Sequence, residues 1–315
     1  MVKSTMKAAI CTQYGPPEVM KIVEVEKPVP KKNEVLVRVM ASPVNSGDAR
    51  VRGLVVKGFL RIVMRFVLGF NKPRKPILGT VFSGVVEQTG KNVKDFNPGD
   101  EVFGITGFKF GTCAEYVVVS EKGLIAKKPA NATFEEAAAI PFGGTSALYF
   151  LEKAKMTEKT NPRVLVYGAT GSVGTAVIQV AKYCNAHVTA VCSEEGESLV
   201  KELGADEVIL YTQEDFTQRN EKFDIVFDAV GKTTKEQCAS LLISGGHYIN
   251  ICGLDIASER KEQLEFLRRR FEEGKYKATI DRVYSLDEVV EAHRYVDTGR
   301  KKGNVVLKMA GREKA

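Results

Sequence analysis

The stretch VLVYGATGSVGTAVIQVAKY, residues 164–183, joins an apolar run to a glycine-rich turn and then to an amphipathic segment. The run at 164–167 predicts a buried strand, and the apolar spacing after Ser172 predicts a helix. The first N–H groups of a helix lack intrahelical partners and lie at the positive end of the helix dipole. A pyrophosphate can bind at such a turn, so a nicotinamide dinucleotide is the first hypothesis for a ligand.

Five residues of this turn are candidate cofactor contacts. Gly171 would let the backbone approach the pyrophosphate, and Gly174, which has no Cβ, would let the helix pack closely on the strand. Ala169 occupies the position of the first glycine in the dinucleotide fingerprint, and Ser172 and Val173 follow at the start of the helix. A glycine pattern alone also occurs in ordinary strand-turn-helix units, so the sequence around it must show whether it binds a dinucleotide.

The residues that follow continue the alternation of strands and helices. Strands are expected at 187–191, 207–210, 223–227 and 247–251, with a helix through 199–203. This alternation predicts an α/β domain with a doubly wound parallel sheet, whose ligands bind beyond the carboxyl ends of the strands. We therefore expect the small residues after the last two strands to face the cofactor, namely Val230, Gly231, Cys252 and Gly253.

The composition is that of a soluble globular chain. The 315 residues are 44% hydrophobic and 27% charged, and their number favours two domains. No apolar run approaches the length of a membrane span and no signal-peptide core is found, so we expect a cytoplasmic location. The net charge of +7 comes from dispersed basic residues without a nucleic-acid-binding face. The cysteines lack CxxC or CxxH spacing, which indicates reduced thiols rather than disulfides or zinc.

The segment FLRIVMRFVLGF, residues 59–70, predicts a short apolar helix with Arg61 and Arg65 along a basic edge. It could pack over a substrate cleft or the domain surface, or it could associate with a membrane. Its length and the lack of a wide polar face favour packing.

Before residue 130 the pattern changes to short strands separated by glycine and proline, which is typical of an irregular β-barrel-like domain. Strands are expected at 7–11, 19–25, 34–41, 84–89, 101–104 and 114–119. Motifs follow in order along the chain: VNSGD (44–48), PILGTVFSG (76–84), PGDEVFG (98–104), GTCAEY (111–116), AAAIP (137–141) and GNVVL (303–307). Together they resemble the medium-chain dehydrogenase/reductase superfamily, and within it the zinc-independent quinone oxidoreductase group.

The resemblance implies a GroES-like, β-rich catalytic domain at 1–127 and 271–315, an inserted Rossmann domain at 128–270, and an active site in the cleft. Zinc-dependent members hold catalytic zinc with a Cys in the first motif and a Gly-His-Glu in the second. This chain has Val44-Asn45 and Gly79-Thr80-Val81 there, and residues 85–112 lack the cysteines of a structural zinc loop. No metal site is therefore expected.

Without a Lewis acid to ionise an alcohol, reduction of an electron-poor acceptor is the favoured chemistry. The resemblance implies hydride transfer from NAD(P)H to a quinone or an α,β-unsaturated carbonyl. Asn45 is the first candidate hydrogen-bond donor near the nicotinamide, although it could instead cap a turn. Asp48 could order a proton relay, or it could cap the helix that follows.

Further cofactor candidates rest on the resemblance. Thr145 matches a position beside the nicotinamide, and it could equally be a helix-interior threonine. Asn304 is a candidate cofactor contact at a position where family members commonly carry a lysine, and Val81 stands where they commonly carry an acidic residue. The chain thus departs from the family at two positions of the cleft.

The choice of cofactor depends on the end of the second Rossmann strand. NAD sites usually place an acidic residue there, whereas NADP sites have a small polar residue and nearby cations. Cys192 and Ser193 favour NADPH, but Glu194 and Glu195 oppose a 2′-phosphate unless they point away, and NADH stays an alternative. Two more residues resemble family positions around the adenosine, Lys182 and Tyr211.

The segment 254–260 is short by comparison with the family, which usually has several dozen further residues here. Those residues form a helix and the last strand of the sheet, and that strand often pairs across a dimer. Either the sheet edge is shortened or a stretch is missing from this sequence. A shortened edge would make the usual homodimer doubtful and would leave an uncovered strand.

Three functions follow from these observations. The first is an NADPH-preferring reductase of quinones or α,β-unsaturated carbonyls, acting without zinc on a small molecule. The second is a non-catalytic NADPH-binding redox sensor, which the departures at Val81 and Asn304 would explain. The third, and the least favoured, is a zinc-dependent alcohol dehydrogenase.

Overall fold

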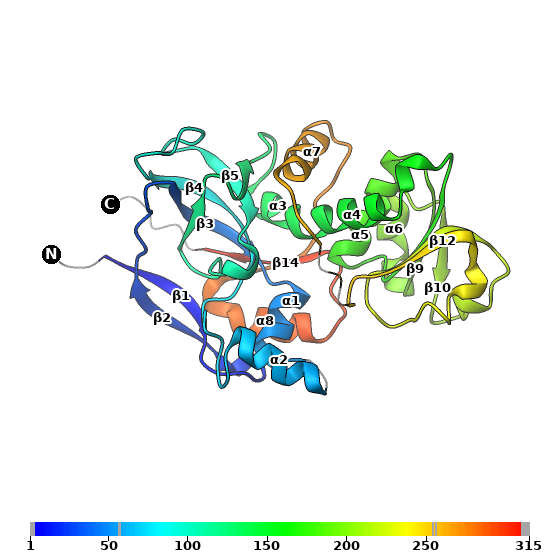
Figure 1. Cartoon of the computed structure of the whole chain (residues 1–315), viewed down its shortest axis with the longest axis horizontal. Coiled ribbons are helices and arrows are strands. Elements are labelled where there is room, and N and C mark those ends of the chain that lie inside the picture. The colour runs from blue at the N-terminus through cyan, green and yellow to red at the C-terminus, as the bar shows by residue number, and fades with distance from the viewer. Residues whose placement is uncertain (1–3, 56–57, 254, 256, 310–315) are drawn as a thin grey trace. The chain divides into compact units, whose positions relative to one another are not determined.

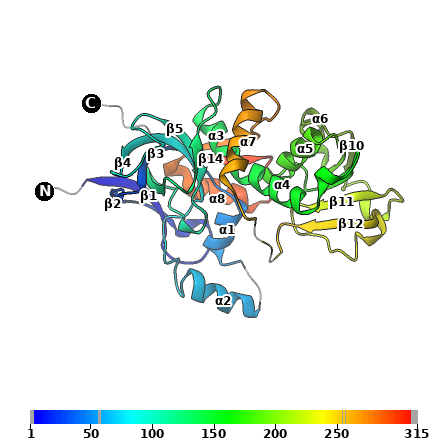
Figure 2. The same cartoon turned by 45° about the horizontal axis from the view of Figure 1, so that its top comes forward.

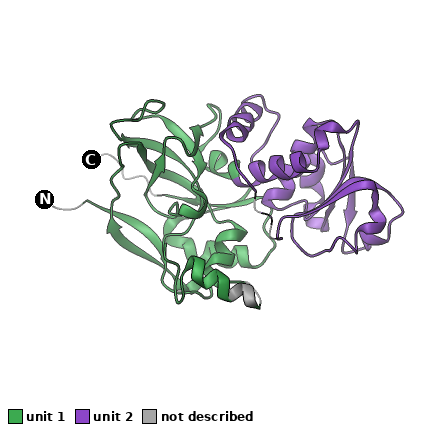
Figure 3. Ribbon diagram, viewed as in Figure 1, with its two compact units in different colours: residues 1–141, 280–315 green, residues 142–279 purple. Residues whose placement is uncertain are grey.

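The computed structural model describes residues 4–55, 58–253, 255 and 257–309. It divides into two compact units, residues 1–141 with 280–315 (unit 1) and residues 142–279 (unit 2) (Figure 3). Residues 254 and 256 of the short predicted segment, and the side chains of residues 59–61, lie outside the described residues. The domain boundaries expected from the sequence, after residues 127 and 270, fall earlier than these unit limits and stay a prediction.

The strands of unit 1 are built around β3 (Glu34–Pro43), which is long enough to pair with three neighbours (Figure 1). Register shifts along β3 bend the strand, and this lets different parts of it meet different partners. Its partners are β4 (Val81–Thr89), β6 (Tyr116–Ser120) and β14 (Asn304–Lys308). The unit also contains β1 (Thr5–Cys11), β2 (Met20–Glu26), β5 (Glu101–Ile105), β7 (Leu124–Lys127) and β13 (Ile280–Ser285).

The core of unit 1 is filled by β-branched and aromatic side chains from these strands, including the fully buried Val37, Phe82 and Val102. The helices of the unit are α1 (Ser46–Gly53), α2 (Phe59–Leu68), α3 (Phe134–Ala139) and α8 (Val289–Asp297). Helix α1 begins three residues after β3 ends, and this short connection fixes the place of the VNSGD motif.

Unit 2 is a parallel sheet in the order β10-β9-β8-β11-β12. The strands are β8 (Arg163–Tyr167), β9 (His187–Cys192), β10 (Glu207–Leu210), β11 (Phe223–Asp228) and β12 (Leu242–Asn250). The central residues of β8, Val164 to Val166, are completely buried, as expected for a parallel strand that is covered on both faces. The helices are α4 (Pro141–Lys153), α5 (Ser172–Tyr183), α6 (Glu197–Glu202) and α7 (Lys261–Glu272) (Figure 2).

The predicted fold class, a β-rich GroES-like domain with a Rossmann-type α/β domain, is confirmed. Strand β12 begins at Leu242 rather than at residue 247, because Gly245 and Gly246 interrupt the apolar pattern without ending the strand. In the described part of the chain β12 pairs only with β11, so the sheet ends there. The expectation that a shortened edge makes the usual homodimer doubtful stays a prediction.

No helix among the described residues is both long enough and apolar enough to cross a membrane.

Candidate functional site

The glycine-rich turn of unit 2 lies at the point where the strand order reverses. Strands β9 and β10 extend the sheet on one side of β8, and β11 and β12 extend it on the other. The ends of β8 and β11 are joined side by side, since the Ala229 N–H donates to the Tyr167 carbonyl at 2.9 Å. Open α/β sheets bind their ligands at such a switch point, beyond the carboxyl ends of the strands.

The turn keeps α5 close to β8 while leaving its own tip open. A Cβ added at Gly174 would lie 2.3 Å from the Gly168 carbonyl oxygen, so only glycine permits this packing. A Cβ added at Gly171, the N-cap of α5, would have only that same oxygen near it, at 3.6 Å. Open space in front of a helix N-terminus is what a pyrophosphate requires. Ala169 is completely buried, while Ser172 and Val173 form the first turn of α5.

The loop after β11 is held in place by one buried carboxylate. Asp228 accepts hydrogen bonds from the N–H groups of Val230 (2.9 Å), Gly231 (2.7 Å) and Thr233 (2.8 Å). The side chain of Val230 is 39% exposed at the switch point, and its contact with a cofactor stays a prediction. The sequence analysis missed Asp228, although an acidic residue at the end of an otherwise apolar strand is a signal that could have found it.

The loop after β12 packs against the loop after β11. The Asn250 side chain accepts from the Cys252 N–H at 2.8 Å, and the Asn250 carbonyl accepts from the Gly253 N–H at 3.3 Å. A Cβ at Gly231 would lie 2.5 Å from the Cys252 Cβ. The structure therefore brings together the two small-residue loops that the sequence predicted to face the cofactor.

The end of β9 carries the residues expected to select the cofactor. Cys192 is buried, and Ser193 precedes a short helical turn at Glu194–Gly196. The Glu194 carboxylate accepts from Thr212 Oγ1 (3.2 Å) and Gln213 Nε2 (3.0 Å), so it already has protein partners. Tyr211 is 50% exposed, and its ring meets the ring of Tyr167 edge-on at 6.3 Å.

The expectation for Lys182 is wrong. Its ammonium group donates to the Asp206 carboxylate at 2.8 Å, and Asp206 also accepts from the Val188 N–H at 2.7 Å, near the amino end of β9. Lys182 therefore lies at the amino ends of the strands, whereas the adenosine position that the resemblance implied lies at their carboxyl ends, because α5 runs antiparallel to the strands.

Helix α4 packs tightly against the start of α5. A Cβ at Gly143 would lie 2.3 Å from the Ser172 carbonyl oxygen. Thr145, one turn into α4, is completely buried, in agreement with the helix-interior alternative. Together, the open N-terminus of α5, the two small-residue loops and the exposed Tyr211 fit a dinucleotide with its pyrophosphate at Gly171.

In unit 1 the VNSGD motif forms the start of α1, and Asp48 ties it to a neighbouring turn. Asp48 accepts from the Asn45 N–H at 2.9 Å and from the Gly79 N–H at 3.2 Å. Burial raises the pKa of Asp48 to about 6, against the lowering effect of these two hydrogen bonds. The contacts of Asp48 are those of the helix-cap alternative.

Asn45 is the N-cap residue of α1, but this role leaves the N–H groups of its side-chain amide without a partner. The residue is only 2% exposed, and its Nδ2 atom is buried without a hydrogen-bond partner. A buried amide donor without a partner is costly, so an unpaired one is often a functional group that waits for a ligand. Asn45 can therefore donate a hydrogen bond to a bound molecule while its backbone caps the helix.

The two positions that depart from the family are both buried. Val81 is completely buried, and its carbonyl accepts from Ser42 Oγ at 2.8 Å. Asn304 Nδ2 donates to the Ala139 carbonyl at 3.1 Å, so this donor holds β14 to the end of α3. Its assignment as a cofactor contact stays a prediction. Sequence reasoning also missed Ser42 and Thr112, whose hydroxyls lie 2.8 Å apart beneath Gly79, because the pair forms only on folding.

Among the described residues, no group of three or more His, Cys, Asp or Glu side chains is arranged to hold a metal ion. The histidine of α8, His293, is completely buried, and burial lowers its pKa to about 3.

Comparison with known proteins shows the family to which the chain belongs. Residues 31–130 match the family "Alcohol dehydrogenase GroES-like domain", and residues 172–275 match "Zinc-binding dehydrogenase". The 2-methylene-furan-3-one reductase of Solanum lycopersicum is 36% identical over 97% of this chain and 80% of its own length. The chain belongs to the medium-chain dehydrogenase/reductase superfamily.

Two further members are also similar over almost the whole chain. The chloroplastic NADPH-dependent alkenal/one oxidoreductase of Arabidopsis thaliana is 31% identical over 97% of this chain and 80% of its own length. The solved structure of the quinone oxidoreductase from Coxiella burnetii has a TM-score of 0.85 and 31% identity, and the match covers 97% of this chain and 99% of that one.

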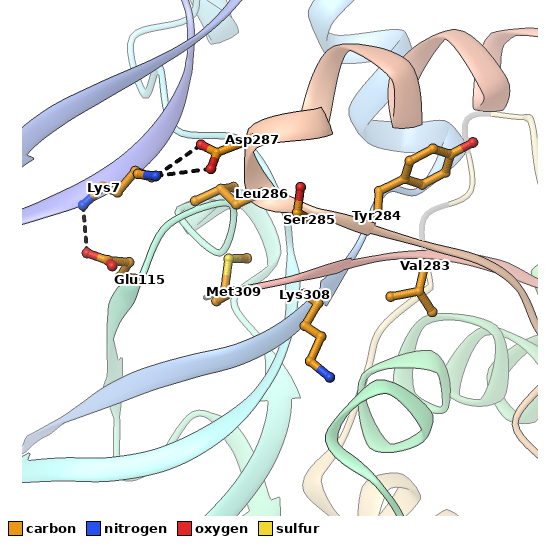
Figure 4. Close-up of a pocket in the computed structure, with 9 residues that line it drawn as sticks. All are labelled: Lys7, Glu115, Val283, Tyr284, Ser285, Leu286, Asp287, Lys308 and Met309. Atoms are coloured by element: carbon orange, nitrogen blue, oxygen red, sulfur yellow. Dashed lines mark hydrogen bonds and ion pairs between the residues drawn. The ribbon is translucent and has the colours of Figure 1, made fainter. Parts of the chain in front are cut away.

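A separate hollow of about 280 Å³ lies in unit 1 and contains none of the predicted site residues (Figure 4). Its lysines already have acidic partners, since Lys7 pairs with Asp287 at 3.1 Å and Lys308 pairs with Glu135 at 3.0 Å. We assign it no role in binding.

Proposed function

We propose that this protein is an NADPH-preferring reductase that transfers hydride to α,β-unsaturated carbonyls or quinones without a metal. Its membership of an oxidoreductase superfamily supports the enzyme class. The similar tomato, Arabidopsis and Coxiella proteins are named for reduction of an enone, an alkenal or enone, and a quinone, which supports the substrate class. The nicotinamide, when bound, supplies the hydride.

The buried, unpaired Nδ2 of Asn45 is the observation that carries the proposal. When hydride reaches the β-carbon of an enone, negative charge builds up on the carbonyl oxygen. An amide N–H held in a buried position can stabilise that oxygen without titrating. Asp48 fixes the backbone of Asn45, so the side chain is positioned before substrate arrives. The turn at Gly171 would hold the pyrophosphate and so orient the cofactor.

Zinc-free action is supported by the residues at the two ligand positions of zinc-dependent members. Asn45 and Thr80 replace a cysteine and a histidine there, and neither side chain supplies the thiolate or imidazole that zinc prefers. This applies although one matching family is described as zinc-binding.

The test is anaerobic oxidation of NADPH, then NADH, with a quinone, an enone and an aldehyde as acceptors. We expect turnover with the enone or the quinone, and no change after treatment with a chelator. Binding of NADPH without turnover on any acceptor would favour the redox sensor. Loss of activity on chelation, restored by zinc, would favour the zinc-dependent alcohol dehydrogenase.

Replacement of Asn45 tests the proposed donor. Asn45→Ala should lower kcat on the enone about 100-fold or more, by analogy with loss of one oxyanion donor, while NADPH affinity stays close to wild type. Asn45→Asp keeps the size of the side chain and removes the amide donor, but it adds a carboxyl group beside Asp48, so it should lower kcat at least as much as Asn45→Ala does. Wild-type kcat in Asn45→Ala would refute the donor role.

A further inference from the structure

Helix α2 of unit 1 has two apolar faces, and only one of them is covered. Met64 and Leu68 point inward and join a small cluster with the buried Leu54 and Phe110. The opposite face carries side chains that solvent reaches: Ile62 is 54% exposed, Val63 36%, Phe66 58% and Val67 58%. Positions three and four residues apart are neighbours on a helix surface, so Val63 and Phe66, Ile62 and Phe66, and Val63 and Val67 join these four side chains into one stripe.

Aromatic side chains near α2 extend this stripe. The ring of Phe70, which is 52% exposed, packs edge-on against Phe66 at 4.8 Å. Phe108, 65% exposed, lies on the short helical turn Gly107–Lys109, and this turn is followed by Phe110, which packs against Leu68 and Met64 of α2. We call this set the α2 surface: Ile62, Val63, Phe66, Val67, Phe70 and Phe108.

The two chain segments that form the α2 surface contain basic residues and no acidic residue. Between Ala49 and Val86 the sequence has basic residues but no Asp or Glu, and the same holds between Val102 and Ala114. Several of the basic side chains are exposed beside the surface, namely Lys72, Arg74, Lys75 and Lys109. Two contacts connect them to it, since the Arg74 N–H donates to the Leu68 carbonyl at 2.7 Å and Lys75 Nζ donates to the Phe108 carbonyl at 3.4 Å.

We propose that the α2 surface binds the headgroup region of an anionic lipid membrane, with α2 lying in the plane of the interface. The sequence analysis favoured packing for this segment, and Met64 and Leu68 do pack, but the opposite face stays exposed. Large exposed apolar side chains and nearby basic residues are two features of an interfacial helix. The apolar stripe would enter the boundary between headgroups and acyl chains, and the lysines and arginine would contact lipid phosphates. Figures 1 and 2 both show α2 at the margin of unit 1.

Charge argues against a second copy of this chain as the occupant. A two-fold symmetric contact places the same surface on both sides, so it would bring the basic residues of the two copies together. An anionic lipid surface supplies the opposite charge over the whole patch.

Tryptophan fluorescence tests the proposal, because the chain contains no tryptophan. Phe66→Trp creates a single reporter on the α2 surface, and Val29→Trp creates a matched one at another exposed apolar position of unit 1, 76% exposed. We expect the emission of Phe66→Trp to shift to the blue with phosphatidylcholine vesicles that contain phosphatidylserine, and this shift to disappear at high salt. Val29→Trp should not shift.

Co-sedimentation of the full chain with the same vesicles gives the second readout. Phe66→Glu should reduce the partition coefficient about tenfold or more, because it puts a charge into the interface. Lys72→Ala should reduce it about fivefold. Val29→Glu should leave it unchanged, and all three variants should keep wild-type KM for a water-soluble enone.

Three outcomes would overturn the proposal. The first is no vesicle binding by the wild-type chain. The second is a dimer in light scattering that Phe66→Glu separates, which would make the occupant a second copy. The third is a raised KM in Phe66→Glu with unchanged vesicle binding, which would make the stripe a substrate wall.

Discussion

Asp48 links a helix start to a turn through a buried carboxylate that has two backbone donors and no cation. Burial raises the pKa of Asp48 from 3.8 to about 6, so between these values the folded protein holds this proton more tightly than the unfolded chain does. The stabilisation that follows from this is fully present below pH 3.8 and is lost as the pH rises through about 6.

Asp48→Asn should therefore remove one pH dependence of stability. We expect the free energy of unfolding of wild type, measured relative to Asp48→Asn, to decrease as the pH rises from about 4 to about 7. Urea unfolding of both proteins at several pH values measures this difference. A difference that stays constant over the range would show that Asp48 has the same pKa in the folded and the unfolded chain, and the raised pKa would then be wrong.

Sequence reasoning located residues whose role lies within one local motif. Asn45 and Gly171 could be selected because capping and turn chemistry depend on a few adjacent residues. Asp228 was missed although its hydrogen bonds to Gly231 and its neighbours are local. Ser42 and Thr112 were missed because their hydroxyls meet only in the folded chain. Lys182 was misplaced since a motif position does not say which end of a helix faces a ligand.

At the scale of elements, the packing of α5 on β8 should depend on Gly174 and not on Gly171. In Gly174→Ala the new Cβ would lie 2.3 Å from the Gly168 carbonyl oxygen and 2.8 Å from the Ala169 Cα. Backbone atoms cannot yield as a flexible side chain does, so α5 must move, at a cost of about 1–3 kcal/mol in the free energy of unfolding. Denaturant unfolding measures this cost.

Gly171→Ser is the matched control on the same turn. Gly171 has a φ of −73°, its added Cβ meets nothing closer than 3.6 Å, and serine is a favoured N-cap residue. We expect its stability to equal that of wild type within about 0.5 kcal/mol. Equal destabilisation of both variants would contradict the assigned packing.

The elements of the fold were easier to predict than their limits. Strand β10 lies at Glu207–Leu210, as expected, because an uninterrupted apolar run ends there at clear turn residues. Strand β7 (Leu124–Lys127) was missed because four residues are too few to display an alternating pattern. The strand pairing of unit 1 could not be derived from periodicity, since β3 changes register twice to reach its neighbours.

At the scale of the whole molecule, the choice between the two cofactors should appear in the stability of the folded chain. A ligand that binds only the folded state stabilises it by about 2.7 kcal/mol at 100 times its Kd. Ser193 offers no carboxylate to the ribose, and the Glu194 carboxylate is occupied by Thr212 and Gln213. NADPH should therefore raise the thermal unfolding midpoint more than NADH does at the same concentration.

Gly171→Asp separates this effect from general stabilisation. Aspartate is a good N-cap and favours the positive end of the helix dipole, so this variant should fold as well as wild type. Its carboxylate would stand where the pyrophosphate binds, and we expect neither NADPH nor NADH to raise its unfolding midpoint. A larger shift with NADH in wild type would instead make Glu194 or Glu195 the ribose ligand, because only a carboxylate that turns toward the cofactor gives that preference.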